Sequence, residues 1–398
     1  MSDFIPNPFR PGAGRVPPEL AGREVLLETF SQMLRQVGAS GDGERPWVLS
    51  GLRGVGKTVL LNEFVRRAHK DRWITVKLEA SSSQSLASSL SRELNIALRK
   101  QSSISDRASI GLKRAWSALR NFQVRFDPAG AVVGLELGLG VPEIGIADSG
   151  DLAVDMQELL RSLAEAAGEL GIGLLIAIDE LQEAPTNDLG ALNVALHNLG
   201  QEGSPPPIVF VGTGLPSLPA VLADATSYAE RLYDYTTIGL LDKKATSQAL
   251  SSPAKQHGVA WDPAALDKVI DSSGGYPYFI QACGKHVWDV RATDVIGMSD
   301  AVLGTARARD EIDQGLYRSR LDRVTPAQRG FLRAMAADAD EPSAISALVT
   351  RTGKRRTADL SVSRRELIRA GYIYAPDRGY VAFTVPGMAN YLERHPDQ

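Results

Sequence analysis

The chain has 398 residues, of which 43% are hydrophobic, and this is enough for roughly two or three domains with true cores. Its formal net charge of -3 argues against a protein that coats nucleic acid along its whole surface, although a local basic face is compatible with it. A single cysteine excludes an internal disulfide framework, and the polar start lacks a signal segment, so we expect a cytoplasmic protein. The most apolar run, at 172–178, is too short to span a bilayer.

The first elements surround a specific motif. Apolar residues at helical spacing over 25–34 predict a helix, and a short apolar run at 46–50 predicts a strand. Residues 51–58 then fit G-x-x-x-x-G-K-[ST] in full, and a further helical pattern follows. Glycines let backbone N–H groups curl around a triphosphate, and the helix directs its positive dipole end at the anion. We therefore expect a phosphate-binding loop of Gly51, Leu52, Arg53, Gly54, Val55, Gly56, Lys57, Thr58 and Val59.

The interval between the loop and the next apolar strand is long. Helical segments are predicted at 84–99 and 109–122, and a glycine-rich stretch with alternating apolar residues predicts a hairpin within 126–146. We treat about 103–150 as an insertion in the core. It would be a partner surface or a lengthened loop, and the loop is favoured.

Two later strands predict the rest of the nucleotide site. Residues 173–180 are an apolar run that ends in Asp179 and Glu180, as expected for a buried parallel strand whose carboxyl end faces a ligand. Asp179 and Thr58 would hold Mg²⁺, Lys57 would reach the β- and γ-phosphates, and Glu180 would polarise the attacking water. The alternative is an acidic helix cap after a core strand. A third strand, at 207–214, places Thr213 where it could touch the γ-phosphate or the attacking water; the alternative is a threonine that begins a turn.

These patterns resemble the AAA+ ATPases of the Orc1/Cdc6-like and STAND type over roughly residues 15–300. Four features carry the resemblance: Gly22-Arg23-Glu24, the loop, the hydrophobic-Asp-Glu pattern at 174–180, and Gly274-Gly275-Tyr276-Pro277 in a presumed lid. The resemblance implies an α/β P-loop NTPase fold with a parallel sheet core and a helical lid, and it implies ATP or ADP with Mg²⁺ as ligands. It also implies that Arg23 and Pro277 lie at the nucleotide and that Arg231 senses or completes a nucleotide site. Alternatively, Arg231 is a solvated arginine beside Glu230.

The chain departs from this family in its lid. Initiator-type members often carry a sensor arginine where this sequence has Tyr276 and Pro277, so we expect slow hydrolysis. Helices at 242–251 and 263–271, with a third through Trp288, predict the lid itself. A polar, arginine-rich stretch at 307–323 joins it to the tail.

The pattern of the tail, residues 325–398, predicts a winged helix. Helices are predicted from Thr325, at 342–349 and at 358–370, and strands at 372–374 and 380–383 flank a turn. The expected domains are thus 1–46 (N-terminal segment and first helix), 47–240 (AAA+ core), 241–324 (helical lid and linker) and 325–398 (winged helix).

Charge in the tail favours duplex DNA as a partner. Over 343–378, basic residues outnumber acidic ones by eight to three. Such a cluster attracts phosphates, and the expected DNA-binding residues are Lys354, Arg355, Arg356, Arg364, Arg365 and Arg378. The open alternative is that the winged helix packs on the lid or a protein partner and that its arginines are solvated.

Two functions follow from these patterns. The favoured one is a slow ATPase that acts as a switch and controls DNA binding or the assembly of partners, including self-association. The alternative is a STAND-like signalling scaffold whose winged helix never touches DNA. A GTPase and a small-molecule kinase are weak candidates, because the sequence has no Asn-Lys-x-Asp element for guanine and nothing resembling an acceptor site.

Overall fold

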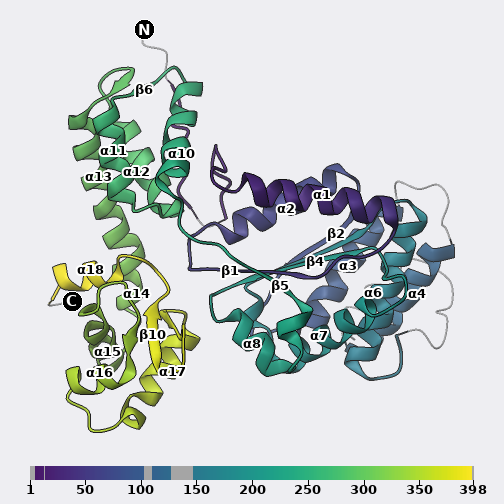
Figure 1. Cartoon of the computed structure of the whole chain (residues 1–398). Coiled ribbons are helices and arrows are strands. Elements are labelled where there is room, and N and C mark those ends of the chain that lie inside the picture. Colours follow the sequence, from purple (N-terminus) through teal and green to yellow (C-terminus); the bar gives the residue numbers. More distant parts are fainter. Residues whose placement is uncertain (1–4, 13, 103–109, 127–146, 397–398) are drawn as a thin grey trace. The chain divides into compact units, whose positions relative to one another are not determined.

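The computed structural model describes residues 5–12, 14–102, 110–126 and 147–396 (Figure 1). The hairpin predicted within 126–146 lies outside the described residues. Contacts divide the chain into two compact units. Unit 1 comprises Met1–Glu24, Gly51–Gly56 and Ile238–Gln398, and unit 2 comprises Val25–Ser50 and Lys57–Thr237. The first six residues of the phosphate loop therefore pack with the C-terminal half of the chain, whereas Lys57 packs with the sheet.

Unit 2 is built on a parallel sheet whose described strands follow the order β2-β3-β4-β1-β5. The predicted strands at 46–50, 173–180 and 207–214 are confirmed as β1, β3 and β4. Every residue of β3 and β4 is buried, which explains their continuous apolar sequence, because both faces of the sheet are covered. The strand bounds are β1 Trp47–Ser50, β2 Ile74–Glu79, β3 Leu174–Asp179, β4 Ile208–Gly214 and β5 Asp234–Thr237.

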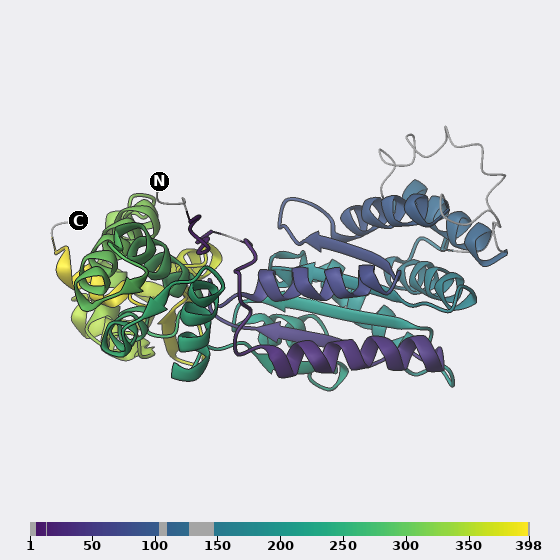
Figure 2. The ribbon, with the colours of Figure 1, turned by 90° about the horizontal axis from the view of Figure 1, so that it is seen from above.

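Helices cover both faces of this sheet. Helices α1 (Glu24–Ser40) and α2 (Lys57–Lys70) run side by side on one face, with α7 and α8 on the other (Figures 1 and 2). Phe30 of α1 stacks on Phe64 of α2 with ring centroids 4.0 Å apart, and Trp47 of β1 meets both rings edge-on. The remaining described helices of unit 2 are α3 Leu86–Ser102, α4 Ile110–Phe126, α6 Leu152–Glu169, η2 Leu181–Glu183, α7 Thr186–Gly200, α8 Leu218–Ala225 and α9 Ala229–Leu232.

A buried carboxylate ties α2 to α1. Glu63 accepts hydrogen bonds from Arg66 Nε at 2.6 Å and Arg67 Nε at 2.9 Å, and Arg67 donates in turn to the Leu27 carbonyl and to Ser31 Oγ. The hydrogen bond from Arg66 is the main cause that lowers the pKa of Glu63. Because the folded pKa is depressed, the stabilisation is present above the unfolded pKa and is lost as pH falls through the folded pKa.

Replacing Glu63 with glutamine should therefore lower the free energy of unfolding by about 1–2 kcal/mol at neutral pH, because the three charge-assisted hydrogen bonds from Arg66 and Arg67 are weakened. The difference from the wild type should shrink as the pH falls below about 4, where the native carboxylate also becomes protonated. Urea unfolding of the whole chain, followed by tryptophan fluorescence at several pH values, measures this. Glu28→Gln, in an exposed pair with Arg35, is the control and should change little. A Glu63→Gln deficit that stays constant with pH would contradict the assignment.

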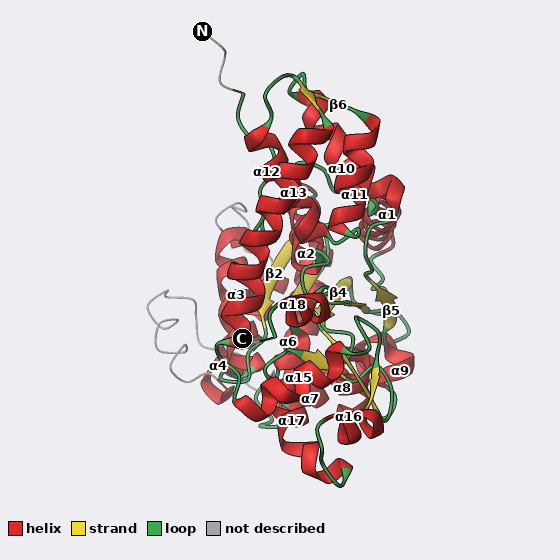
Figure 3. Ribbon diagram, turned by 90° about the vertical axis from the view of Figure 1, so that its left-hand side faces the viewer, coloured by secondary structure: helices red, strands yellow, loops and turns green. Residues whose placement is uncertain are grey.

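The middle of unit 1 is a helical bundle. Helices α10 (Lys243–Gln256), α11 (Pro263–Ser273) and α12 (Pro277–Val290) confirm the predicted lid helices, and α13 (Met298–Ile312) packs against α11 and α12 (Figure 3). Two short parallel strands, β6 (Ala260–Trp261) and β7 (Val295–Ile296), join the loops of this bundle. The arginine-rich connecting stretch at 307–323, for which the sequence indicated no secondary structure, is helical: α13 continues into a π-helical turn, η3 (Asp313–Arg318), and then α14 (Ser319–Leu321).

The tail of unit 1 contains the predicted helices and strands together with two elements that the sequence pattern missed. Helix α15 begins with a capping box between Thr325 and Gln328, as the Thr-Pro start predicted. The sheet order is β8-β10-β9, and β9 pairs with β10 in an antiparallel hairpin. The missed elements are β8 and α18. The bounds are α15 Pro326–Ala336, β8 Ser343–Ala344, α16 Ile345–Arg351, η4 Thr357–Leu360, α17 Ser361–Arg369, β9 Ile373–Tyr374, β10 Tyr380–Phe383 and α18 Met388–Arg394.

Among the helices described here, none is both long and apolar enough to cross a bilayer.

Candidate nucleotide-binding site

The sheet of unit 2 brings the predicted phosphate-contacting lysine and the acid pair to one edge. Strand β4 lies between β1 and β3, and Leu49 of β1 is in register with Thr213. Because all these strands are parallel, Lys57, which follows β1, and Asp179, which ends β3, belong to the carboxyl edge. The chain leaves β1 for the edge strand β2 but leaves β4 for the opposite edge strand β5. Open α/β sheets bind ligands at such a reversal, outside the carboxyl ends of the strands.

Within unit 1, the predicted phosphate loop is held by Tyr276, the residue that precedes α12. The Tyr276 hydroxyl donates a hydrogen bond to the Arg53 carbonyl. Burial raises the pKa of Tyr276, so this phenol stays protonated and can donate. Gly54 has φ +79°, and a Cβ on it would collide with the Tyr276 hydroxyl. A glycine at this position is therefore required both by the backbone angle and by the close approach of the tyrosine.

Two residues that the resemblance assigned to the nucleotide have definite places in unit 1. Arg23 Nη2 lies 3.5 Å from the Val55 carbonyl of the loop and 2.5 Å from the Gly239 carbonyl. Burial lowers the pKa of Arg23. Pro277 is the first residue of α12, and the contact from this position to the loop is made by its neighbour, Tyr276. The sequence had given no signal for this tyrosine beyond its place beside Pro277.

Asp179 is oriented by its neighbours at the carboxyl edge. The Thr213 hydroxyl donates to Asp179 Oδ1, and the Glu180 N–H donates to the same oxygen at 3.0 Å. Both side chains are buried, with Asp179 4% and Thr213 0% exposed. The two bonds to Oδ1 leave Oδ2 for a cation. Thr213, predicted to touch the γ-phosphate or the attacking water, thus has a defined partner in Asp179, the carboxylate predicted to hold the metal.

The donor set at this edge fits Mg²⁺. Magnesium prefers oxygen ligands and usually binds through one or two protein oxygens together with waters and substrate phosphates. Asp179 Oδ2 and the Thr58 hydroxyl are oxygens of this kind. Within the described parts of the chain, no group of three His, Cys, Asp or Glu side chains forms a cage that would hold a metal by itself. The arrangement therefore suits a metal that arrives with a nucleotide.

Glu180 has a strained backbone and a specific side-chain partner. Its φ of 48° and ψ of 41° are left-handed, which costs a non-glycine residue on the order of 1 kcal/mol. Gln182 Nε2 donates to Glu180 Oε2 at 2.6 Å, while Gln182 Oε1 accepts from the Leu215 N–H at 3.0 Å. Gln182 therefore fixes the Glu180 carboxylate relative to the end of β4. Sequence reasoning missed Gln182, because a polar residue in the turn after a strand is not distinctive.

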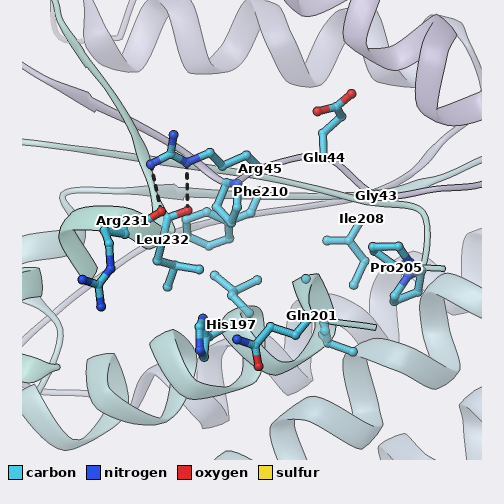
Figure 4. Close-up of a pocket in the computed structure, with 15 residues that line it drawn as sticks. Gly43, Glu44, Arg45, His197, Gln201, Pro205, Ile208, Phe210, Arg231 and Leu232 are labelled. Carbon is cyan, nitrogen blue, oxygen red and sulfur yellow. Dashed lines mark hydrogen bonds between the residues drawn. The ribbon is translucent and has the colours of Figure 1, made fainter. Parts of the chain in front are cut away.

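Arg231, expected to sense or complete a nucleotide site, lies at the amino edge of the sheet. It lies in the short helix α9 (Ala229–Leu232), which precedes β5, and β5 starts in register with the beginning of β1. Arg231 also lines a pocket of about 280 Å³ formed at the amino ends of β1, β4 and β5 (Figure 4). Arg45 closes this side by donating to the Arg231 carbonyl at 2.8 Å. Strand β5 therefore lies between Arg231 and the carboxyl edge of the sheet.

The predicted DNA-binding residues come from three places in the tail. Lys354, Arg355 and Arg356 follow α16, Arg364 and Arg365 belong to α17, and Arg378 lies in the turn between β9 and β10. All are exposed except Arg364, which is half-buried and has its Nε without a hydrogen-bond partner. Arg351, which was counted in the local charge, instead pairs with Asp338, with Nη2 2.7 Å from Oδ1.

A parallel sheet with a glycine-rich loop after β1 and an Asp-Glu pair after β3 is typical of P-loop nucleotide-binding proteins. The comparisons are more specific. Residues 19–211 match the family model of the AAA ATPase domain, and residues 314–392 match that of a domain of unknown function, DUF8462. No curated protein matches the sequence.

Two solved structures share the fold over almost their whole length. The Walker-type ATPase Paby2304 of Pyrococcus abyssi has 17% sequence identity and a TM-score of 0.58, covering 96% of this chain and 98% of its own. The ORC2 protein of Aeropyrum pernix, solved as ADPNP-ADP complexes, has 14% identity and a TM-score of 0.54, covering 96% of each chain. At these identities the likeness concerns the fold alone. The family model and the fold together support an ATP-binding AAA+ ATPase.

Proposed function

We propose that this protein is a slow AAA+ ATPase that acts as a nucleotide-dependent switch, and that its tail is a winged helix that engages duplex DNA. The observation that carries the ATPase proposal is the carboxyl edge of the sheet, where Lys57 begins α2 and where Thr213 and the Glu180 N–H orient Asp179. These are the groups that phosphoryl transfer needs for positioning and charge stabilisation.

The proposed roles follow the contacts. The amides of Gly51–Gly56 and the start of α2 bind the phosphates, with Lys57 on the β- and γ-phosphates. Thr58 and Asp179 hold Mg²⁺, which when bound neutralises charge on the phosphates. Glu180, fixed by Gln182, positions the attacking water, and Thr213 keeps Asp179 in place. Arg23, Val59 and Pro277 remain proposed neighbours of the nucleotide.

Slow hydrolysis is supported by the place of Arg231. An arginine that stabilises transition-state charge accelerates phosphoryl transfer by orders of magnitude. Arg231 stands at the amino edge, so it can only complete the site of a second copy of the chain. An isolated chain would therefore hydrolyse ATP slowly. Self-association is the condition under which Arg231 would contribute.

The winged-helix proposal for residues 325–398 rests on the order of elements. Helix α15, strand β8, helices α16 and α17, and the β9–β10 hairpin follow one another, and the hairpin turn carries Arg378. Such a module presents a helix and a basic turn to DNA. We keep 241–324 as the lid and linker, and 47–240 as the ATPase core with its insertion.

Reversing two charges tests the DNA proposal. Arg355→Glu with Arg356→Glu should lower affinity for a short duplex by about tenfold or more at low salt and flatten the salt dependence of binding, because phosphate contacts release counterions. Fluorescence anisotropy with a labelled duplex measures both. Lys255→Glu with Lys268→Glu makes the same change of net charge on exposed lid residues and should leave affinity nearly unchanged. Equal loss in both double variants would mean that only net charge matters.

A STAND-like scaffold is the second candidate, and one contact favours it. The Arg53 N–H of the phosphate loop donates to the Thr384 carbonyl of the tail at 3.1 Å, within unit 1. A tail held in this way on the loop is what a nucleotide-locked signalling protein would need. Absence of duplex binding at low salt in the apo, ADP and ATP-analogue forms would favour the scaffold over the DNA-binding switch.

A further inference from the structure

Two arginines of unit 1 meet at one glycine of the tail. Gly371 has φ +69°, and a Cβ on it would collide with the guanidinium of Arg53 from the phosphate loop. Arg320 of α14 donates from Nη1 to the carbonyl of the same glycine at 3.4 Å. Residues distant in sequence thus bring two positive charges together beside the loop. Only a glycine at 371 lets Arg53 approach so closely in this backbone conformation.

This pair of arginines has no carboxylate partner. Among the described residues, neither Arg53 nor Arg320 forms an ion pair, and the Nε of Arg53 is buried without a hydrogen-bond partner. Burial lowers the pKa of Arg320, and the neighbouring charge of Arg53 lowers it further. Two half-buried guanidinium groups in contact with one residue are costly unless an anion compensates them. The two guanidinium groups therefore favour an anion as their ligand.

The backbones of both arginines are fixed by hydrogen bonds. The Arg53 N–H donates to the Thr384 carbonyl, and the Arg53 carbonyl accepts from Tyr276. The Arg320 carbonyl accepts from the Tyr372 hydroxyl at 2.9 Å. The Thr384 hydroxyl donates to the Gly371 carbonyl at 2.6 Å, which ties the strand end to the glycine between the two guanidinium groups. The arginines are thus held in place before any ligand arrives, which lowers the entropy cost of binding.

We propose that Arg53 and Arg320 together bind the terminal phosphate of ATP, and that this contact lets the tail distinguish ATP from ADP. The inference rests on the proposed nucleotide site. The loop amides and the start of α2 serve the inner phosphates, whereas the terminal phosphate carries the most charge and needs cations. Guanidinium forks match a phosphate in geometry as well as in charge.

The location of Arg320 gives this site a consequence for the tail. Arg320 belongs to the helical connection that leads into the tail, and Gly371 and Thr384 belong to the tail itself. A terminal phosphate would join these parts to the loop, whereas ADP would leave two like charges facing each other. A ligand shifts a conformational equilibrium only through such a difference in affinity between states. ATP should therefore strengthen the contact between loop and tail.

The test compares nucleotides in the full-length chain. Isothermal titration with Mg²⁺ and either ADP or a non-hydrolysable ATP analogue should show that wild type prefers the analogue. Arg320→Gln should lower affinity for the analogue by about tenfold while ADP affinity stays within about twofold, because one charge-assisted contact is lost. Arg53→Gln should produce the same selective loss. Arg318→Gln, an exposed position on the same helical segment, is the matched control and should preserve the preference.

Further arms separate the ways in which the proposal can fail. Thermal unfolding of the apo variants checks folding, and Arg320→Lys, which keeps the charge but loses the fork, should lie between wild type and Arg320→Gln. If wild type binds neither nucleotide, the proposed function itself fails. If ADP and the analogue bind equally to wild type, or if Arg320→Gln weakens both alike, the inference is overturned while the nucleotide site stands. If inorganic phosphate bound the protein only in the absence of ADP, the two arginines would form a site for a free anion. If the arginine variants lost only their binding to duplex DNA, the two arginines would bind a nucleic-acid phosphate. Either result would also overturn it.

Discussion

Replacing Lys57 with alanine should abolish the binding of ATP and ADP, with an affinity loss of roughly 100-fold or more. Lys57 is 5% exposed at the start of α2, so it is shielded from solvent, and we propose that it contacts the β- and γ-phosphates. Removing it takes away charge-assisted contacts to two phosphates, each worth about 1.5–3 kcal/mol. Titration with a fluorescent ATP analogue measures the loss.

Lys70→Ala is the matched control for this variant. Lys70 is an exposed residue at the opposite end of the same helix, and its removal should leave nucleotide affinity unchanged. Circular dichroism would establish that both variants keep the fold. Full nucleotide affinity in a folded Lys57→Ala protein would remove the basis of the proposed ATPase.

Replacing Glu180 with glutamine should trap ATP. The amide keeps the size of the side chain but cannot polarise a water, so turnover should fall by on the order of 10²–10⁴-fold while ATP affinity changes little. The left-handed backbone and the bond from Gln182 hold this carboxylate in place, so the amide occupies the same position. Single-turnover hydrolysis of radiolabelled ATP, with retention of the label after gel filtration, measures both quantities.

Glu183→Gln is the control for this second variant, because Glu183 is an acid on the same short turn. It should hydrolyse ATP at close to the wild-type rate. If Glu180→Gln and Glu183→Gln both kept wild-type turnover, another group would have to activate the water. An equal fall in both would indicate that the turn as a whole, and not one carboxylate, is what matters.

Sequence alone was sufficient for the elements with strong local patterns. Strands β1, β3 and β4 are wholly buried, so their apolar runs were unambiguous, and the glycine-rich loop has few alternative interpretations. The lid helices and the tail hairpin likewise carried caps, turns and regular spacing. The position of Lys57 and Asp179 at one sheet edge followed from the rule that parallel strands share their carboxyl ends.

The sequence patterns did not predict the features that depend on tertiary packing. Strand β5 is short, polar and only partly buried, so no hydrophobic pattern predicted it. Without β5, nothing could indicate that Arg231 precedes a strand and stands at the amino edge. Gln182 and Arg320 were missed for a related reason: each acts through a partner far away in sequence, Leu215 for the first and Gly371 for the second. Local spacing carries no information about such pairs.

The division of the phosphate loop between the two units has a practical consequence for dissecting this protein. Gly51–Gly56 pack with residues beyond 237, although the family match ends at residue 211. A truncated fragment cut after the sheet would retain the whole sequence motif but would deprive Arg53 and Gly54 of the tyrosine and the strand end that shape them. Weak nucleotide binding by such a fragment would therefore reflect a missing scaffold, and full-length protein is the proper starting material for biochemistry.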